Sequence, residues 1–314
     1  MPRTRILRGL HAVASPPTRA VVSIGVFDGV HRAHQHIVRS TVRLAHRLQG
    51  TSVIVTFDPD PSVVLNPRHA PPALMPVEDR IHQLCRLGVD WIWVVPFTKQ
   101  FSRLKPEQFV RRILLRRLRA RALVVGADFA FGRDRRGNMT LLQALGAPTG
   151  MRVIPTGPIR RGGAVISSSR IRGLIARGRL RAAASLLGRP PVLYGMVVRG
   201  VGRGRRLGVP TANIRLIPQV LPPQGVYAVL VRSTADRRDR RGVMNLGVRP
   251  TFGGGPVTCE VHLVGFSGTV PRRPVAVSLL ARLRSERCFP SPAALVRQVR
   301  RDVSRARQLF RRIV

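Results

Sequence analysis

The sequence predicts two successive domains, an α/β domain and then an all-β domain, because its apolar pattern changes once along the chain. Up to about residue 187, short apolar runs alternate with longer helical patterns, which indicates a parallel sheet with helices on its faces. From residue 188 onward, short apolar runs are separated by turns rich in Gly and Pro, as in an antiparallel barrel or sandwich. A chain of 314 residues is long enough for two cores, and we expect domains at 1–187 and 188–314.

Each expected element follows from one such run. Strands of the first domain are expected at 21–27, 52–57, 91–97, 122–129 and 151–156. Its helices are expected at 34–48, 78–87 and 106–119, with a helix pair over 167–187 that is broken at Gly178. The apolar runs of the second domain are 192–198, 225–231, 242–248, 258–264 and 275–281. An amphipathic, arginine-rich helix over 292–312 closes the chain.

The charge of the chain raises a competing function. The net charge is +41, from 55 Lys and Arg against 14 Asp and Glu, and only Lys99 and Lys105 are lysines. Such a chain binds polyanions through counterion release, so a basic nucleic-acid-binding protein is an alternative. The arginines are spread through every segment, however, and aromatic residues for base stacking make up only 5%. We therefore expect nucleic acid to be bound non-specifically at most, and interpret the arginine content as a compositional bias.

The cysteines and the hydropathy of the sequence indicate the cellular compartment of the protein. No apolar run approaches the roughly 18 residues that a membrane-spanning helix needs. The basic N-terminus lacks the apolar stretch of a secretory signal. The three cysteines, Cys85, Cys259 and Cys288, form neither a CxxC pair nor a zinc spacing. We expect free thiols in a reducing compartment, a cytoplasmic protein and no membrane partner.

A glycine turn with two histidines joins the first expected strand to the first helix. The segment Gly25–His34 reads GVFDGVHRAH and lies where ligands bind in open parallel sheets. His31 and His34 can face the same side of the first helical turn, where the backbone N–H groups and the helix dipole favour anions. Two imidazole donors there suit a triphosphate, and Asp28 can orient an imidazole or hold the turn. A metal site or purely structural histidines remain alternatives.

A basic glycine loop in the second domain runs into a rigid Pro-Thr element. Its glycines permit close approach to phosphates, and its Thr and Asn supply oxygen ligands suited to Mg²⁺. The residues concerned are Gly202, Gly204, Gly208, Pro210, Thr211 and Asn213. Taken alone, this run is equally well an ordinary turn. Glu260 lies inside an apolar run of a chain with few acidic residues, which is noticeable, although a surface ion-pair partner on a strand would also fit.

These motifs resemble those of the bifunctional riboflavin kinase/FMN adenylyltransferases, the bacterial FAD synthetases. GVFDGVHRAH resembles the GxFDGVHxGH signature of their nucleotidylyltransferase domain. The segments VTFDPDPSVVL (55–65), VVGADFAFG (124–132) and ISSSRIR (166–172) continue the match. The loop at 202–213 resembles the GRGxxLGxPTAN motif of riboflavin kinases, and similar stretches follow in order at 245–252, 259–263 and 283–289.

The resemblance implies a fold and two reactions. The fold is an α/β Rossmann-like nucleotidylyltransferase domain, followed by a six-stranded antiparallel β-barrel riboflavin-kinase domain with a C-terminal helix. The second domain would phosphorylate riboflavin to FMN, and the first would adenylylate FMN to FAD with release of pyrophosphate. ATP is the implied co-substrate and Mg²⁺ the implied cofactor. Only the kinase needs a general base, because the FMN phosphate is already an anion.

The resemblance also implies the site residues. The ATP site of the adenylyltransferase would comprise Gly25, Phe27, Asp28, Gly29, His31, His34, Ser167, Ser168, Ser169, Arg170 and Arg172, with His31 and His34 also catalytic. Its flavin site would comprise Asp128, Phe129 and Phe131. The kinase would bind ATP and Mg²⁺ at Gly202, Gly204, Gly208, Pro210, Thr211 and Asn213, with Thr211 and Asn213 as the metal ligands. Glu260 would be its catalytic base, and its flavin site would include Arg284 and Glu286.

Residues 167–169 can cap a helix and place the two arginines in its first turn. An arginine there opposes the helix dipole, and a bound anion would remove that conflict. Two positions depart from the family pattern: Ala33 replaces a usual glycine, and Asp60 stands where a histidine is expected. A riboflavin kinase with weakened adenylyltransferase activity is therefore a further alternative.

Overall fold

The computed structural model describes residues 4–199, 208–233, 238–248, 257–266, 268 and 270–313. Its internal contacts divide the chain into two compact units. The first unit comprises residues 1–71 and 76–168, and the second comprises residues 72–75 and 169–314. This division assigns residues 169–187 to the second unit, whereas the boundary expected from the sequence lies after residue 187.

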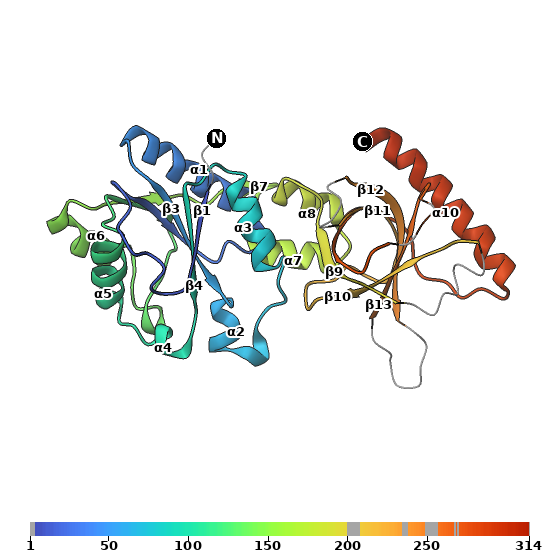
Figure 1. Ribbon diagram of the computed structural model, residues 1–314, viewed down its shortest axis with the longest axis horizontal. Helices are drawn as coiled ribbons and strands as arrows, with labels where there is room; N and C mark the ends of the chain where they lie inside the picture. Colours follow the sequence, from blue (N-terminus) through green and yellow to red (C-terminus); the bar gives the residue numbers. More distant parts are fainter. Residues whose placement is uncertain are drawn as a thin grey trace. The chain divides into compact units, whose positions relative to one another are not determined.

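The first unit is a parallel sheet with helices on its faces (Figure 1). Its six strands run in the order β1-β4-β3-β2-β5-β6, and every neighbouring pair is parallel. The strands are β1 (Arg5–Arg8), β2 (Val21–Ile24), β3 (Ser52–Asp58), β4 (Trp91–Pro96), β5 (Ala122–Gly126) and β6 (Arg152–Thr156). The four expected internal strands and β6 are confirmed. The edge strand β1 escaped prediction because only one of its four residues is buried.

Two apolar layers hold the helices against the sheet. Helix α1 (Arg32–Arg47) buries Val38, Leu44 and Ala45, and the last two pack against apolar residues of β2 and β5. The larger core lies on the other face around Trp93 and Leu123, both fully buried. Strands covered on both faces are mainly apolar, which is why β2 and β3 are nearly continuous apolar runs that are buried along almost their whole length.

The remaining elements of the first unit refine the prediction. The helix expected at 78–87 is α3 (Val77–Cys85), and the one expected at 106–119 is divided into α5 (Pro106–Phe109) and a π-helical segment, η3 (Val110–Arg117). Strand β2 ends three residues early because Phe27 adopts a left-handed backbone conformation (φ 54°). The unpredicted short elements are α2 (Pro61–Leu65), α4 (Lys99–Ser102), α6 (Met139–Gly146) and the hairpin β7 (Arg160–Arg161) and β8 (Ala164–Val165).

The second unit is a closed antiparallel barrel in the order β10-β13-β12-β11-β14-β9, which excludes the sandwich alternative. Its strands are β9 (Val192–Val198), β10 (Ala212–Leu216), β11 (Gly225–Ser233), β12 (Arg240–Val248), β13 (Val257–Leu263) and β14 (Pro274–Arg284). The expected helix pair is α7 (Ser168–Ala176) and α8 (Leu180–Leu187), separated at Gly178 (φ 71°). Strand β10 was not predicted, because only one of its five residues is fully buried and it continues the glycine-loop motif.

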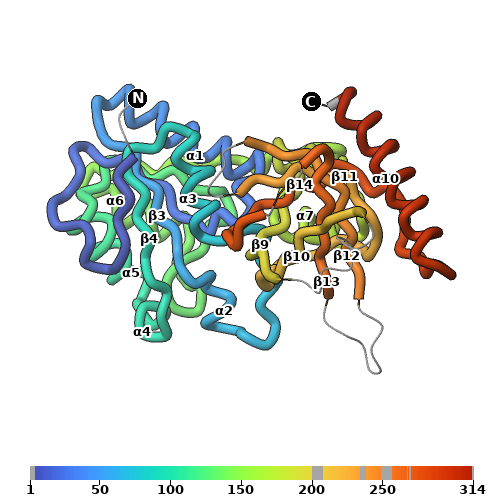
Figure 2. The backbone as a smooth tube through the Cα atoms, turned by 45° about the vertical axis from the view of Figure 1, so that its right-hand side comes forward, coloured from blue at the N-terminus to red at the C-terminus, as the bar shows by residue number. Residues whose placement is uncertain are grey.

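The barrel has an apolar interior and one covered patch outside. Alternate residues of the strands, such as Met244 and Val261, fill the interior. The intervening residues face outward, and the final helix, α10 (Pro292–Ile313), covers some of them. Its Ala306 and Phe310 are fully buried in an apolar cluster with Val243. Figure 2 shows α10 lying along the outside of the barrel.

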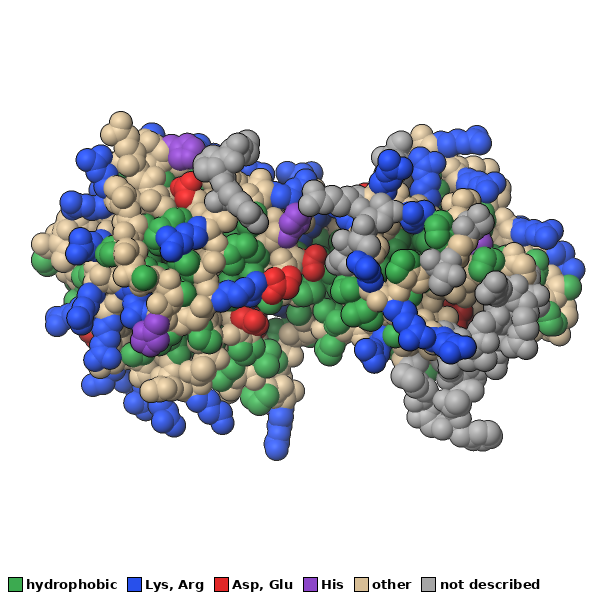
Figure 3. All heavy atoms as spheres, viewed as in Figure 1, with side chains coloured by type: hydrophobic (Ala, Val, Ile, Leu, Met, Phe, Trp, Pro, Cys, Tyr) green, Lys and Arg blue, Asp and Glu red, His purple; other side chains and the backbone are tan. Residues whose placement is uncertain are grey.

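Basic side chains are scattered over both units. Figure 3 shows Lys and Arg side chains across the visible face of each unit, with no single basic patch. In the part of the chain that the structure describes, no helix is long and apolar enough to cross a membrane. The dispersed charge agrees with a compositional origin of the arginine content.

A net charge of +41 should destabilise the folded state through self-repulsion. We therefore expect the melting temperature to rise as NaCl or phosphate is added, because salt screens like charges. Binding to a random oligonucleotide should be weak and largely lost by about 0.2 M salt. Thermal melts and fluorescence anisotropy across a salt series measure both effects. A sequence-selective complex that survives at that salt concentration would contradict the compositional interpretation.

Candidate active sites

The first site lies where the strand order of the parallel sheet reverses. Strand β2 pairs with β3 on one side and with β5 on the other. Ligands of open α/β sheets bind beyond the carboxyl ends of the strands at such a switch point. Gly25–His34 follows β2 and Asp128–Phe131 follows β5. The fold therefore brings these two predicted segments to the same edge of the sheet.

The glycine turn after β2 depends on an unusual backbone. Phe27 (φ 54°) and Gly29 (φ 79°) both have positive φ values, and the 3-10 turn η1 (Asp28–Val30) between β2 and α1 is buried. A Cβ on Gly25 would lie only 3.2 Å from the ring of Phe27, so glycine lets that ring fold back over the end of the strand. The turn directs the chain into α1 and positions His31 at the helix start.

The two histidines are held together at that helix start. His31 caps α1, and its Nδ1 accepts a hydrogen bond of 3.3 Å from the backbone N–H of His34. Neutral His31 therefore carries its ring proton on Nε2. The two imidazole rings stack with centroids 3.6 Å apart and planes 17° apart, and the Phe27 ring meets His34 edge-on. The prediction that both imidazoles occupy one side of the first turn is correct.

The environment of His34 disfavours its charged form. Burial lowers the pKa of His34 well below its usual 6.5, and any positive charge on His31, together with that of Arg80, lowers it further. The residue is partly exposed, but its Nδ1 atom is buried and has no hydrogen-bond partner among the described residues. Without a bound anion, His34 is therefore neutral near pH 7.

Arg80 is the residue of this site that the sequence did not reveal. It projects from α3, is almost fully buried, and donates hydrogen bonds of 2.7 Å to the carbonyl of Val26 and 2.6 Å to that of Phe57. These carbonyls lie at the carboxyl ends of neighbouring parallel strands, so Arg80 ties the glycine turn to β3. Burial lowers the pKa of Arg80, against the opposing charge of Asp28 and of two further carboxylates. One arginine among so many carried no distinguishing pattern.

The ISSSRIR segment reaches the glycine turn through one serine. The Ser168 hydroxyl donates a hydrogen bond of 2.9 Å to the backbone carbonyl of Asp28. Helix α7 begins at Ser168, directly after Ser167, so a capping position for Ser167 agrees with the prediction. Arg170 falls in the first turn of the helix, whereas Arg172 lies just beyond it and donates to the Pro72 carbonyl at 2.8 Å. Ser169 is exposed.

The predicted flavin segment belongs to an aromatic cluster. The rings of Phe129 and Phe131 stack with centroids 5.5 Å apart, and Phe131 also meets Phe109. Ring contacts continue from there to Phe101, Phe97 and Phe57. Asp128 lies close to the strand end, since a Cβ on Gly126 would come within 2.9 Å of its Oδ1. The sequence singled out two of these rings but not the cluster.

The two departures from the family pattern have ordinary local structures. Asp60 caps α2, because its Oδ1 accepts hydrogen bonds from the backbone N–H of Ser62 at 2.8 Å and from its hydroxyl at 2.7 Å. Ala33 lies inside α1 and has no positive φ value, so its backbone does not require glycine.

The second site is a row of polar residues on the outside of the barrel. Glu260 of β13 lies directly opposite Asn213 of β10 on one side and Asn245 of β12 on the other. Residues 259 and 261 are buried in the barrel interior, so Glu260 and its two cross-strand partners face outward. Neither asparagine partner could be identified without the register of the strands.

Glu286 joins this row from the segment after β14. The amide Nδ2 of Asn245 lies 3.5 Å from its Oε1, and the carboxylate covers the backbone of Gly247 so closely that a Cβ there would overlap it. Arg284, the last residue of β14, directs its guanidinium to Asp302 of α10. The structure thus brings Glu286 to the predicted kinase site and shows that most of the donors of Arg284 are already occupied.

The start of β10 is fixed by a further histidine. Gly208 has φ 71°, and the Pro210 carbonyl lies 2.9 Å from Nδ1 of His262. Because a carbonyl only accepts, this Nδ1 carries a proton. Thr211 follows Pro210 and lies directly before β10, of which Asn213 is the second residue. Gly202 and Gly204 lie outside the described residues.

Among the described residues, the sites contain neither a reactive thiol nor a cluster of His, Cys, Asp or Glu side chains that could hold a metal ion. Burial raises the pKa of Cys259 to about 12, and the charge of Glu260 adds to this effect, so the thiol stays protonated. In the described part of the chain, no group of three or more His, Cys, Asp or Glu could hold a metal ion.

Comparison with known proteins agrees with this pair of sites. A family model described as FAD synthetase matches residues 14–170, and one described as riboflavin kinase matches residues 187–310. Curated bifunctional riboflavin kinase/FMN adenylyltransferases match over nearly their full lengths. The Escherichia coli K12 protein is 35% identical, covering 98% of each chain, and that of Pseudomonas fluorescens is 37% identical, covering 97% of each. This chain belongs to that family.

As a bifunctional FAD synthetase, the chain has an FMN adenylyltransferase domain and a riboflavin kinase domain, as predicted. The Haemophilus influenzae member is 36% identical over 98% of this chain and 99% of its own. A crystal structure described as a macrolide-efflux protein from Streptococcus pneumoniae is 30% identical, with a TM-score of 0.85, over 97% of this chain and 99% of that one. The efflux description applies to that protein alone, and the structural similarity supports the predicted fold.

The Arg80 charge should help to keep His34 neutral. We expect Arg80→Met to raise the pKa of His34 towards 6.5, though not fully, because burial is the larger cause. Arg80→Lys, which keeps the charge, is the matched control and should leave the pKa low. Histidine NMR titration measures the pKa of His34 in both variants, and an unchanged pKa in Arg80→Met would show that the Arg80 charge does not contribute.

In the wild type, the free energy of unfolding should fall as the pH drops below 6.5. The reason is that the His34 side chain takes up a proton there in the unfolded chain but not in the folded one.

Proposed function

We propose that the two sites of this FAD synthetase act separately on riboflavin, FMN and ATP, and that the residues described above carry the two reactions. The functional boundary of the proposal lies between residues 187 and 188. Support comes from the end of α8 at Leu187, from Gly188 with φ 79°, and from the riboflavin kinase model, which begins at residue 187. The observation that supports the proposal most strongly is the strand register, which sets Glu260 between Asn213 and Asn245.

In the adenylyltransferase, the protein's task is to align two anions. The glycine turn, with Gly25, Phe27, Asp28 and Gly29, would hold the ATP phosphates at the start of α1, where the helix dipole favours them. His31 would donate from Nε2 and His34 from its neutral ring to charge that develops at the α-phosphate and on the departing pyrophosphate. The FMN phosphate attacks without a base because it is already ionised.

Other predicted residues complete this domain. Ser167, Ser168, Ser169, Arg170 and Arg172 are proposed as the second phosphate-binding segment, supported by the bond of Ser168 to the glycine turn. The flavin is proposed to stack near Asp128, Phe129 and Phe131, since an aromatic cluster at the carboxyl edge of the sheet suits a planar ring system.

In the kinase, Glu260 is proposed as the general base. The ribityl hydroxyl of riboflavin is a poor nucleophile until a carboxylate accepts its proton, and Glu260 faces outward from the barrel where a substrate can reach it. The phosphates of ATP are assigned to the loop that comprises Gly202, Gly204, Gly208 and Pro210. Arg284 and Glu286 are proposed to border the flavin.

The oxygen donors of this site fit Mg²⁺. Thr211 and Asn213 would hold the ion together with phosphate oxygens, because hard oxygen ligands suit Mg²⁺ and the ion usually keeps few protein ligands. When bound, it would neutralise charge on the transferred phosphoryl group. A cytoplasmic location belongs to the same proposal and is supported by the three free thiols, Cys85, Cys259 and Cys288.

His31→Ala combined with His34→Ala should abolish FAD formation from FMN while phosphorylation of riboflavin continues. The reason is that both imidazoles belong to the helix start of the α/β domain and none of the proposed kinase residues does. Chromatographic separation of FMN and FAD from parallel reactions measures the two rates. Ala33→Gly, the control, should keep or raise FAD formation. Equal loss of both activities in the folded double variant would argue for one shared site.

Glu260→Gln should impair the kinase alone. Glutamine keeps the shape of the side chain but accepts no proton, and general bases contribute about 10²–10⁴-fold, so kinase turnover should fall by roughly that factor. FMN supplied directly should still become FAD at nearly the normal rate. Steady-state assays of the two half-reactions decide the question, with the exposed Glu107→Gln as the matched control. Unimpaired phosphorylation would remove Glu260 from the mechanism.

A further inference from the structure

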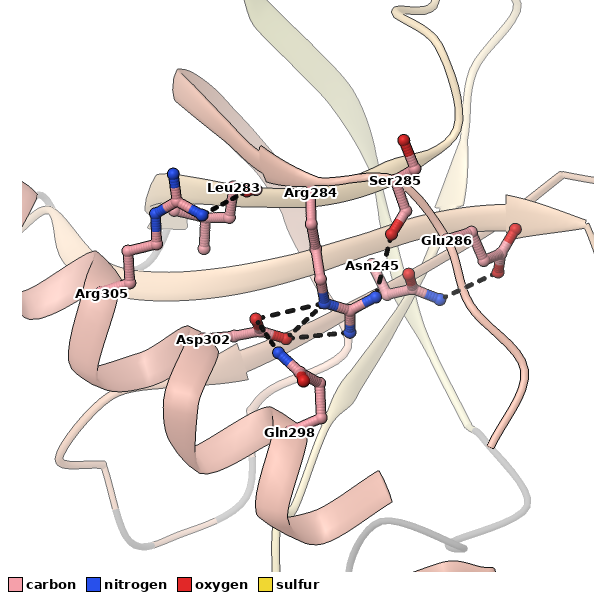
Figure 4. A network of polar contacts seen from close by, with 8 residues as sticks. All are labelled: Asn245, Leu283, Arg284, Ser285, Glu286, Gln298, Asp302 and Arg305. Carbon is pink, nitrogen blue, oxygen red and sulfur yellow. Dashed lines mark hydrogen bonds and ion pairs between the residues drawn. The ribbon is translucent and has the colours of Figure 1, made fainter. Parts of the chain in front are cut away.

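A buried ion pair joins the last strand of the barrel to the final helix. Arg284 donates from Nε to both carboxylate oxygens of Asp302, at 3.2 and 3.0 Å, and its Nη2 lies 2.9 Å from Oδ2 (Figure 4). The two side chains are only 12% and 6% exposed. Gln298, one turn earlier on α10, donates to the same carboxylate at 2.9 Å.

The pair also fixes the chain that follows β14. The Nη1 of Arg284 donates to the carbonyl of Ser285 at 3.0 Å, and the guanidinium lies 5.6 Å from the ring centroid of Phe289. Ser285 is thereby tied to a side chain that Asp302 already orients. Glu286, the next residue, then falls over Gly247 and beside Asn245. Figure 4 shows the contacts of Arg284 with Asp302 and Ser285, and the separate contact of Asn245 with Glu286, which the backbone between Ser285 and Glu286 connects.

The ion pair is a poor explanation of helix docking by itself. Ala306 and Phe310 already anchor α10 through fully buried apolar contacts with the barrel. Burying an ion pair costs desolvation energy that its attraction barely repays, and apolar replacements are often as stable. The distinctive contribution of the ion pair is to fix the orientation of the Arg284 guanidinium, because a planar guanidinium held by two carboxylate oxygens has one orientation.

We propose that Asp302 is a positioning residue of the riboflavin kinase. Through Arg284 it orients Ser285, and so holds Glu286 at the polar row beside the base, where riboflavin would bind. The role rests on the proposed function of Glu260 and Glu286, and it assigns Arg284 an indirect part in flavin binding in addition to any contact of its own. Asp302 itself lies on α10 and touches none of the reacting atoms.

The test compares Asp302→Asn with the double variant Arg284→Met/Asp302→Leu. The double variant removes both charges together, so it should keep the thermal stability that a single buried charge would cost. Both should raise the KM for riboflavin and lower kcat/KM by up to about 100-fold, the loss that a misplacement of about 1 Å far from the chemistry can cause. The KM for ATP and the rate of FAD formation from FMN should stay near wild-type values. Asp302→Glu, which keeps the charge, should recover part of the loss.

A second, more exposed ion pair of the same barrel provides a control for the removal of two opposite charges. Arg232 and Asp239 form a two-contact pair at 2.8 and 2.7 Å, and neither belongs to the polar row. Arg232→Met/Asp239→Leu should leave every kinetic constant unchanged. A folded Arg284→Met/Asp302→Leu protein with a wild-type KM for riboflavin would overturn the proposal, as would a parallel loss of FAD formation. Absence of kinase activity in the wild type would instead overturn the proposed function.

Discussion

Strand pairing is the constraint on which both sites depend. In the first unit, parallel pairing places the carboxyl ends of β2 and β5 side by side, so the segments after them lie at the same edge of the sheet although they are far apart in the sequence. In the second unit, antiparallel register sets Asn213, Glu260 and Asn245 opposite one another on three strands. A shift of one residue in that register would turn Glu260 into the apolar interior, which burial of its neighbours opposes.

Arginine has two different roles in this chain. Most basic side chains lie dispersed on the surface, where each is solvated and contributes mainly to net charge. Arg80 is buried and the side chain of Arg284 is nearly so, and each uses its planar fork to hold backbone carbonyls or a carboxylate in one arrangement. Each lies just outside a proposed reaction centre. Because arginines occur throughout the sequence, the few that make directional contacts cannot be recognised from the sequence.

The two sites also differ in the chemistry that their substrates require. A phosphate nucleophile needs alignment and charge stabilisation, and the first site offers a helix start, stacked imidazoles and a neutral His34. A hydroxyl nucleophile needs a proton acceptor as well, and the second site has carboxylates on the outside of the barrel. Separate cores allow each environment to be set without compromising the other.

The sequence alone determined the types of the longer elements, the change from α/β to barrel, and the residues of the ungapped motifs, because periodicity and motif spacing are local properties. It predicted His31, His34 and Glu260 on this basis, and the helix start places the two histidines together as expected. The edge strand β1, Arg80, the pairing of Glu260 with two asparagines and the link from Asp302 to Glu286 were decided only by tertiary structure. These features join residues far apart in the chain, and one arginine or asparagine carries no local pattern that distinguishes a buried partner from a solvated one.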